Sequence, residues 1–138
     1  MKAHLALVLV VTALVATSGI RAESAAVVKT GKFTALNGEV ASGSVALVRL
    51  ADGRRVLRLL NTKFGAGPAL RVYLVAGTVD GNEDVRSFKD LGPLKARSGR
   101  QSYAVPASVN TDRYATVVVW CREFSVAFGA ARLRSAAQ

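Results

Sequence analysis

The sequence predicts an all-β protein, folded as either a sandwich or a barrel. Short apolar segments alternate with turn residues at fairly even spacing, which is typical of antiparallel β folds. After residue 22, no window shows a helical period sustained over ten residues. At 138 residues the chain has room for one domain, and it contains no repeat or long linker. With 51% hydrophobic and 20% charged residues, a disordered chain is excluded.

Residues 1–22 are predicted to be a secretory signal peptide. A short start that contains Lys2 and His4 precedes an apolar run at residues 5–16, in which only Thr12 is polar. As a helix this run is about 18 Å long, which is shorter than the membrane core of about 30 Å. Cleavage is expected after Ala22 or, alternatively, after Ser18. An uncleaved signal anchor is the other interpretation.

The mature chain, residues 23–138, is then expected to be one exported domain without a transmembrane span, at a periplasmic, extracellular or cell-surface location. Cleavage removes the only His and the only Met, and leaves a single Cys. Loss of Lys2 and Arg21 lowers the number of basic side chains from 19 to 17, so the net charge against nine acids falls from +10 to +8. These charges are scattered and include no aromatic–basic recognition motif, which argues against a nucleic-acid partner.

The absence of histidine from the mature chain excludes whole classes of chemistry. It removes Ser-His-Asp and Cys-His nucleophile pairs and any histidine general base. One cysteine cannot build a zinc site, and blue-copper and haem sites would lack their His or Met ligands. Lysine or tyrosine chemistry is not excluded, but nothing singles such residues out. We therefore predict no metal, no cofactor and a non-catalytic role.

The first strong hairpin is predicted around Asp52 and Gly53. Residues 32–34 open the set of strands, and the hairpin arms follow at residues 44–50 and 54–60. An Asp-Gly pair accepts the positive φ angles of a type I′ turn, so we expect that turn between the two arms.

Four further strands are expected after a break at residues 65–68. The strongest prediction among them is the strand at residues 114–121, whose three consecutive valines indicate burial on both faces of the sheet. Two polar or glycine-containing segments, residues 77–84 and 91–94, are expected to be a loop and a turn. The expected strands are residues 69–75, 99–106, 114–121 and 124–128, the last of which alternates with large apolar groups on one face.

The hairpin carries a basic group that is a candidate binding site. Arg54, Arg55 and Arg58 lie on its second arm, and Arg49 lies on the first. If Arg49 and Arg58 are cross-strand neighbours, they repel each other unless an anion or an acid lies between them. A phosphate, an anionic glycan or a lipid headgroup would fit there. The alternative is a solvated face without a ligand.

Cys121 is the redox candidate, and it has two interpretations. It ends the most apolar strand, where solvent can reach a thiol, and thiolate formation there would permit a mixed disulfide or a sulfenic acid. Alternatively, Cys121 is a buried small hydrophobe beside Val119. Trp120 and Tyr103 could form an electron path or a ligand stack, or fill the core as aromatic side chains usually do.

The C-terminal residues resemble the signature of the DM-thirteen domain family, the small β domain of Skeletor-type proteins that also occurs beside DOMON domains. The matching pattern is Val118-Val119-Trp120-Cys121, followed by Phe124-x-Val126-x-Phe128-Gly129-x-Ala131-x-Leu133. Earlier residues agree in order: Gly31-x-Phe33, Gly43, Phe64, Gly67-Pro68, Leu70, Tyr73-Leu74, Leu91-Gly92-x-Leu94-Lys95, Gly99-x-Gln101-x-Tyr103 and Val105-Pro106. The resemblance covers about residues 30–133. The chain departs from it at Ala69, where an acidic residue is expected.

The resemblance implies an exported or surface module, folded as a single antiparallel β-sandwich with Greek-key-like connections. It also implies a redox or electron-transfer role centred on a nearly invariant cysteine, which matches Cys121. The leading hypothesis is therefore an accessory redox module that uses Cys121, with Trp120 beside it and an unknown protein redox partner or envelope partner. The alternative is a binding or scaffolding module of the cell envelope that contacts a protein or an anionic polymer.

Overall fold

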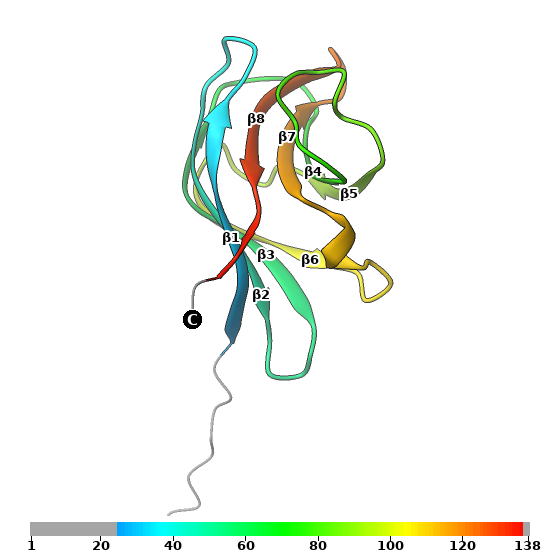
Figure 1. Ribbon diagram of the computed structural model, residues 1–138. Coiled ribbons are helices and arrows are strands. Elements are labelled where there is room, and N and C mark those ends of the chain that lie inside the picture. The colour runs from blue at the N-terminus through cyan, green and yellow to red at the C-terminus, as the bar shows by residue number, and fades with distance from the viewer. Residues whose placement is uncertain (1–24, 137–138) are drawn as a thin grey trace, which may run out of the picture.

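The computed structural model describes residues 25–136, which form nine strands and one turn of 3-10 helix (Figure 1). The predicted signal peptide lies outside these residues. Among the described residues, no helix has the length and apolar character that crossing a bilayer requires. The strands are β1 (Ala26–Ala35), β2 (Ala41–Arg49), β3 (Arg55–Phe64), β4 (Leu70–Val75), β5 (Phe88–Pro93), β6 (Ser98–Val105), β7 (Thr116–Cys121), β8 (Val126–Arg132) and β9 (Arg134–Ser135), with the helix η1 (Thr111–Arg113) before β7.

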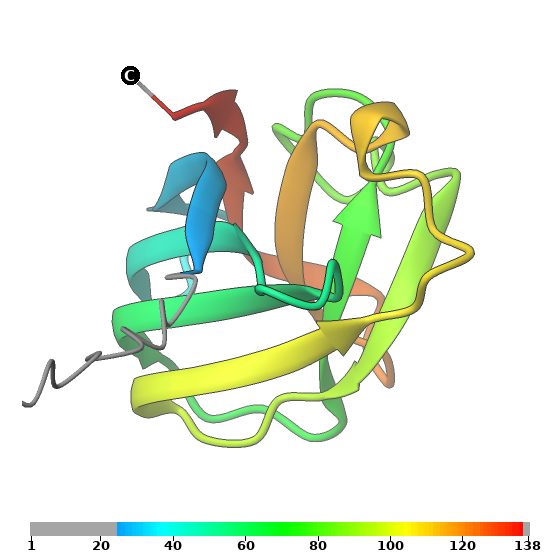
Figure 2. The ribbon, with the colours of Figure 1, turned by 90° about the horizontal axis from the view of Figure 1, so that it is seen from below.

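All strand pairs are antiparallel, so the predicted all-β antiparallel class is confirmed. The strand order is β5-β4-β7-β8-β1-β2-β3-β6, and β9 pairs with β1. The end strands β5 and β6 come close to each other, so the sheet is nearly closed into a barrel (Figure 2).

Strand β1 joins the two halves of this sheet. Its first part pairs with β2 and β9, whereas residues 33–35 pair with β8. The change of partner occurs beside Gly31, where an added Cβ would lie 2.5 Å from the carbonyl oxygen of Arg132. Only glycine allows the two backbones to pass this closely.

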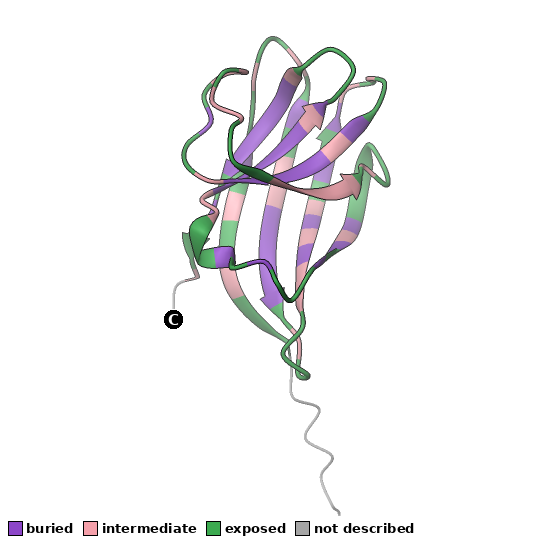
Figure 3. Cartoon of the chain, turned by 90° about the vertical axis from the view of Figure 1, so that its right-hand side faces the viewer, coloured by how far each residue is buried: buried purple, intermediate pink, exposed green. Residues whose placement is uncertain are grey.

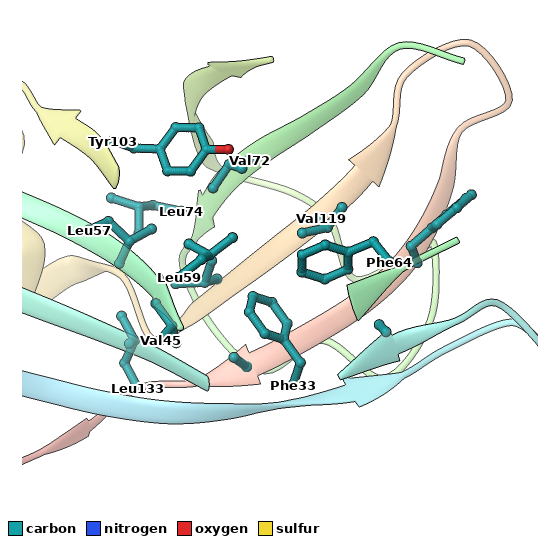
Figure 4. Packing of buried hydrophobic residues seen from close by; sticks show 14 of the residues in the cluster. Phe33, Val45, Leu57, Leu59, Phe64, Val72, Leu74, Tyr103, Val119 and Leu133 are labelled. Carbon is teal, nitrogen blue, oxygen red and sulfur yellow. The ribbon is translucent and has the colours of Figure 1, made fainter. Parts of the chain in front are cut away.

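The main core lies inside the curled sheet, between its two halves (Figure 4). Leucine and valine side chains of β2 and β3 meet those of β4 and β7, and fully burying each contributes about 1.5–3 kcal/mol. Phe33 and Phe64 pack edge to face, with ring centroids 5.1 Å apart. Figure 3 shows buried residues concentrated along the strands, with the loops at both ends largely exposed.

A second, smaller cluster lies on the outer face of β4, β7 and β8. Tyr73, Val75, Val118 and Ala130 belong to it, and Val79 covers them from the loop of residues 76–87. The neighbours Val117 and Val119 point into the main core. The predicted burial of β7 on both faces is therefore confirmed.

The predicted hairpin at Asp52 and Gly53 is confirmed, but its turn is not of type I′. Only Gly53 has a positive φ, of 87°. The Gly53 amide donates to the Leu50 carbonyl oxygen at 2.9 Å, and the Leu50 amide donates to Arg54 at 2.8 Å. This pattern is a type I turn followed by one left-handed residue, which closes a three-residue loop.

Two other predictions of local structure are wrong. The expected turn at residues 91–94 falls largely within strand β5, because pairing with β4 imposes an extended backbone on a segment that contains Gly92 and Pro93. Phe124 was expected to start the last strand with its ring in the apolar row, but residues 122–125 form the β7–β8 turn. The Phe124 side chain is therefore exposed.

Substitution of Gly31 by Ala should lower the free energy of unfolding by about 1–3 kcal/mol, because the methyl group must displace the Arg132 backbone. Gly65→Ala is the matched control, since its Cβ would meet only ordinary contacts, the nearest at 3.6 Å. Urea denaturation of both variants measures the difference. Equal stability of the two variants would contradict the proposed crowding at Gly31.

Candidate functional site: the Cys121 thiol and the surrounding aromatic residues

Cys121 lies at the end of β7, opposite Leu70 on β4 and Val126 on β8. Its side chain is fully buried in the main core. The Sγ atom donates a hydrogen bond to the carbonyl oxygen of Pro68 at 3.1 Å. The expectation that solvent reaches this thiol is wrong, because the β4–β7 pairing continues to the last residue of the strand.

The loop of residues 65–69 covers the thiol. Its chain is fixed at one end by the Arg122 amide, which donates to the carbonyl oxygen of Ala69 at 3.1 Å. Gly67 lies against the ring of Phe128, and a Cβ there would come within 2.7 Å of that ring. Ala69 has a φ of 54°, which is unfavourable for a residue with a side chain. A small, partly strained loop therefore separates Cys121 from solvent.

Trp120 lies on the opposite face of β7 from Cys121. Its ring stacks with Tyr73 at 6.2 Å between centroids and 26° between planes. Tyr73 in turn stacks with Phe88 at 4.2 Å and 10°. The three rings form a row across β7, β4 and β5, which we call the outer aromatic row. The structure thus separates Trp120 from the thiol, although the two residues are adjacent in sequence.

Tyr103 does not pair with Trp120, contrary to the expectation of a shared electron path. It lies in the main core, where its hydroxyl accepts a hydrogen bond from the Lys95 amide at 2.8 Å and donates one to Gln101 Oε1. Its position in the main core supports the alternative interpretation of Tyr103 as a core residue. The ring that stacks with Trp120 is that of Tyr73, a residue of the family pattern for which the sequence predicts no role at the site.

The outer aromatic row borders a partly buried ion pair. Arg71 Nε lies 2.7 Å from Asp90 Oδ2, and this pair connects β4 to β5. Burial raises the pKa of Tyr73 above its ordinary value of 10.0, and the negative charge of Asp90 raises it further. The Tyr73 phenol therefore stays protonated to a higher pH than an unperturbed tyrosine does.

Two arginines of the basic hairpin, Arg54 and Arg55, bond to other groups of the protein. Arg54 Nε bonds to Asp52 Oδ2 at 2.6 Å. Arg55 crosses to the loop before η1, where it donates to Thr111 Oγ1 at 2.9 Å and to the Val109 carbonyl oxygen at 2.6 Å.

Arg49 and Arg58 are not cross-strand neighbours. Arg49 lies opposite Arg55, and Arg58 lies between Ala46 and Ser102. The predicted repulsion between Arg49 and Arg58 therefore does not arise, and neither does a reason for an anion between them.

An antiparallel β domain with one buried thiol is thus the class that the fold and the site define. The model of the family described as electron transfer DM13 matches residues 32–133. This match covers most of the chain, so the protein belongs to the DM13 family, and the resemblance noted in the sequence is confirmed. No curated protein matches the chain, and no solved structure matches it.

Replacement of Arg55 by Met should lower the free energy of unfolding by about 1–3 kcal/mol, because the buried Thr111 and the Val109 carbonyl lose a charged donor. Arg54→Met is the matched control and should change it by less than about 0.5 kcal/mol, since Arg54 is exposed. Thermal or urea unfolding compares them. A similar loss of unfolding free energy in both variants would show that Arg55 contributes only a surface charge.

Replacement of Tyr73 by Phe should make the protein less sensitive to alkaline pH. The raised pKa means that the folded state holds the phenolic proton more tightly than the unfolded chain does. This contribution to stability is complete below about pH 10 and is lost as the pH rises through the folded pKa. Urea midpoints measured from pH 8 upward should therefore fall less steeply for Tyr73→Phe. If the urea midpoints of the wild type and of Tyr73→Phe fall equally with pH, a raised pKa of Tyr73 in the folded state is contradicted.

Proposed function

We propose that the protein is exported and acts as a non-catalytic electron-transfer accessory module, with the Cys121 thiol as its redox group. The family description supplies the electron-transfer role. The redox role is assigned to the Cys121 thiol because Cys121 is the only cysteine in the chain. The observation that carries the proposal is the contact between Sγ and the Pro68 carbonyl, beneath a short loop at the end of the core.

The proposed step is thiol–disulfide exchange with a disulfide-bearing protein partner. When the loop of residues 65–69 opens, the Cys121 thiol releases its proton to water and the thiolate attacks one sulfur of the partner's disulfide. A new Cys121–partner S–S bond forms, the partner's own S–S bond breaks, and its other sulfur leaves as a thiolate that takes up a proton. The partner's disulfide accepts the electron pair, and a second thiol from the partner's side must release Cys121.

The loop supports a gated thiol better than a permanently inert one. Pro68 and Ala69 are exposed, and Ala69 has a left-handed backbone. Within residues 25–136, the one polar contact of Sγ is to the loop itself. Opening this loop needs no strand to leave the sheet. Local openings of this kind cost less free energy than global unfolding.

Trp120 has a supporting role in this proposal. Its ring lies on the partly exposed side of β7 and stacks with Tyr73, so a partner that docks on the outer aromatic row would contact the strand that carries Cys121. A binding role for the basic hairpin has less support, since Arg54 and Arg55 bond within the protein.

Native-state labelling of Cys121 with an aromatic disulfide tests the proposal, because the probe undergoes the same exchange. We expect slow labelling without denaturant, at a rate that depends weakly on low urea, since opening the loop exposes little surface. Pro68→Gly should accelerate labelling about two- to fivefold by loosening the loop.

Pro106→Gly is the control, because this proline lies in a loop that does not contact the thiol, and it should leave the labelling rate unchanged. Cys121→Ser should abolish labelling. If labelling of the wild-type protein occurs only at the rate of global unfolding, with the full urea dependence, the thiol is structural and the proposal fails.

A further inference from the structure

A groove of about 650 Å³ lies on the outer face of the sheet, where β1 changes partner. We call it the β1–β9 groove; the residues that matter here are Thr30, Lys32, Thr78, Asp80, Arg132 and Arg134. This volume is within the range of small-molecule sites, about 300–1,000 Å³. Cys121 points into the core and does not line the groove.

Three cationic side chains meet at this groove because of the strand register. Phe33 pairs with Ala131, so the adjacent outward-facing residues Lys32 and Arg132 stand opposite each other. Arg134 lies opposite Thr30, one further outward position along β1. Like charges that face each other across a strand pair destabilise the sheet unless an anion lies between them.

The described residues supply little compensation for these charges. None of the three cations has a carboxylate within ion-pair distance in residues 25–136. Asp80 is the one acidic residue among those that line the groove, so three positive charges face one negative charge. The groove therefore has an excess of positive charge next to side-chain hydroxyls such as those of Thr30 and Thr78.

The opposite wall of the groove is held in place before any ligand binds. Thr116 Oγ1 donates to the Gly77 carbonyl oxygen at 2.6 Å, which fixes the start of the loop of residues 76–87. Asn82 Oδ1 accepts from the Ala127 amide at 2.8 Å and from Asn37 Nδ2 at 2.9 Å. Between these anchors, Val79 is buried in the outer cluster. A preformed wall lowers the ordering cost of binding.

We propose that the β1–β9 groove binds a phosphate-bearing ligand. Arginine guanidinium groups match phosphate oxygens with paired N–H donors, and Lys32 adds a third positive charge. A doubly charged phosphate group balances the net excess left after Asp80, and the remaining volume accommodates the rest of the ligand. The site is separate from the thiol and does not depend on the redox proposal.

Calorimetric titration with inorganic phosphate and with pyrophosphate tests the proposal on the full mature chain. The wild-type protein should bind pyrophosphate saturably at one site. Arg132→Gln/Arg134→Gln should weaken binding at least about tenfold, since two charge-assisted contacts are lost. Both side chains are exposed, so this double variant is expected to fold.

The matched control is Arg100→Gln/Arg113→Gln, which removes the same charge from exposed positions outside the groove and should change affinity less than about twofold. An equal loss in both double variants, or no saturable binding by the wild type, would overturn the proposal. Labelling of Cys121 should be the same in both double variants as in the wild type, which separates this test from that of the redox function.

Vesicles of phosphatidylcholine with phosphatidic acid distinguish the source of the phosphate. Binding to these vesicles that pyrophosphate displaces identifies a lipid headgroup as the ligand class. Binding of soluble pyrophosphate without vesicle binding identifies a soluble phosphate compound. Either result supports the phosphate chemistry of the groove.

Discussion

The close passage of β1 over the backbone of β8 at Gly31 is the constraint on which the rest of the structure depends. It lets one strand pair with β2 and β9 on one side of the bend and with β8 on the other. The sheet can therefore curl around a single main core. The same bend opens the β1–β9 groove on its outer face, so the core and the groove have a common geometric origin.

Much of the fold could be predicted from the sequence, because it depends on local patterns. Three consecutive valines in β7 indicate two buried faces, and the Asp-Gly pair indicates a hairpin. The type of turn could not be predicted, since an Asp-Gly pair is compatible with either one or two positive φ angles. Strand β5 was missed for a different reason: Gly92 and Pro93 have turn propensities, and pairing with β4 overrides them.

The candidate site was only partly predictable. The residue counts identify Cys121 as the one redox candidate, because the chain has a single cysteine and its single histidine lies in the predicted signal peptide. Because side chains alternate along a strand, Trp120 is expected on the other face of β7. The contact between Trp120 and Tyr73 depends on β4 being the neighbour of β7, although 40 residues separate these two strands in the chain. The cationic groove similarly depends on the register of β1 against β8 and β9. No local pattern around Lys32, Arg132 or Arg134 reveals that register.

The incomplete closure of the sheet has a consequence for how the protein behaves among copies of itself. Strands β5 and β6 each keep one side without a ladder partner in the described chain, and such edges can template association between molecules. Both edge strands carry features that oppose such association between molecules. On β5, Pro93 lacks an N–H group, and Gly92 has a positive φ of 115°. On β6, Gly99 has a positive φ of 89°, and Arg100 places a charge on the strand. The sequence that leaves the sheet open thus also discourages its edges from aggregating.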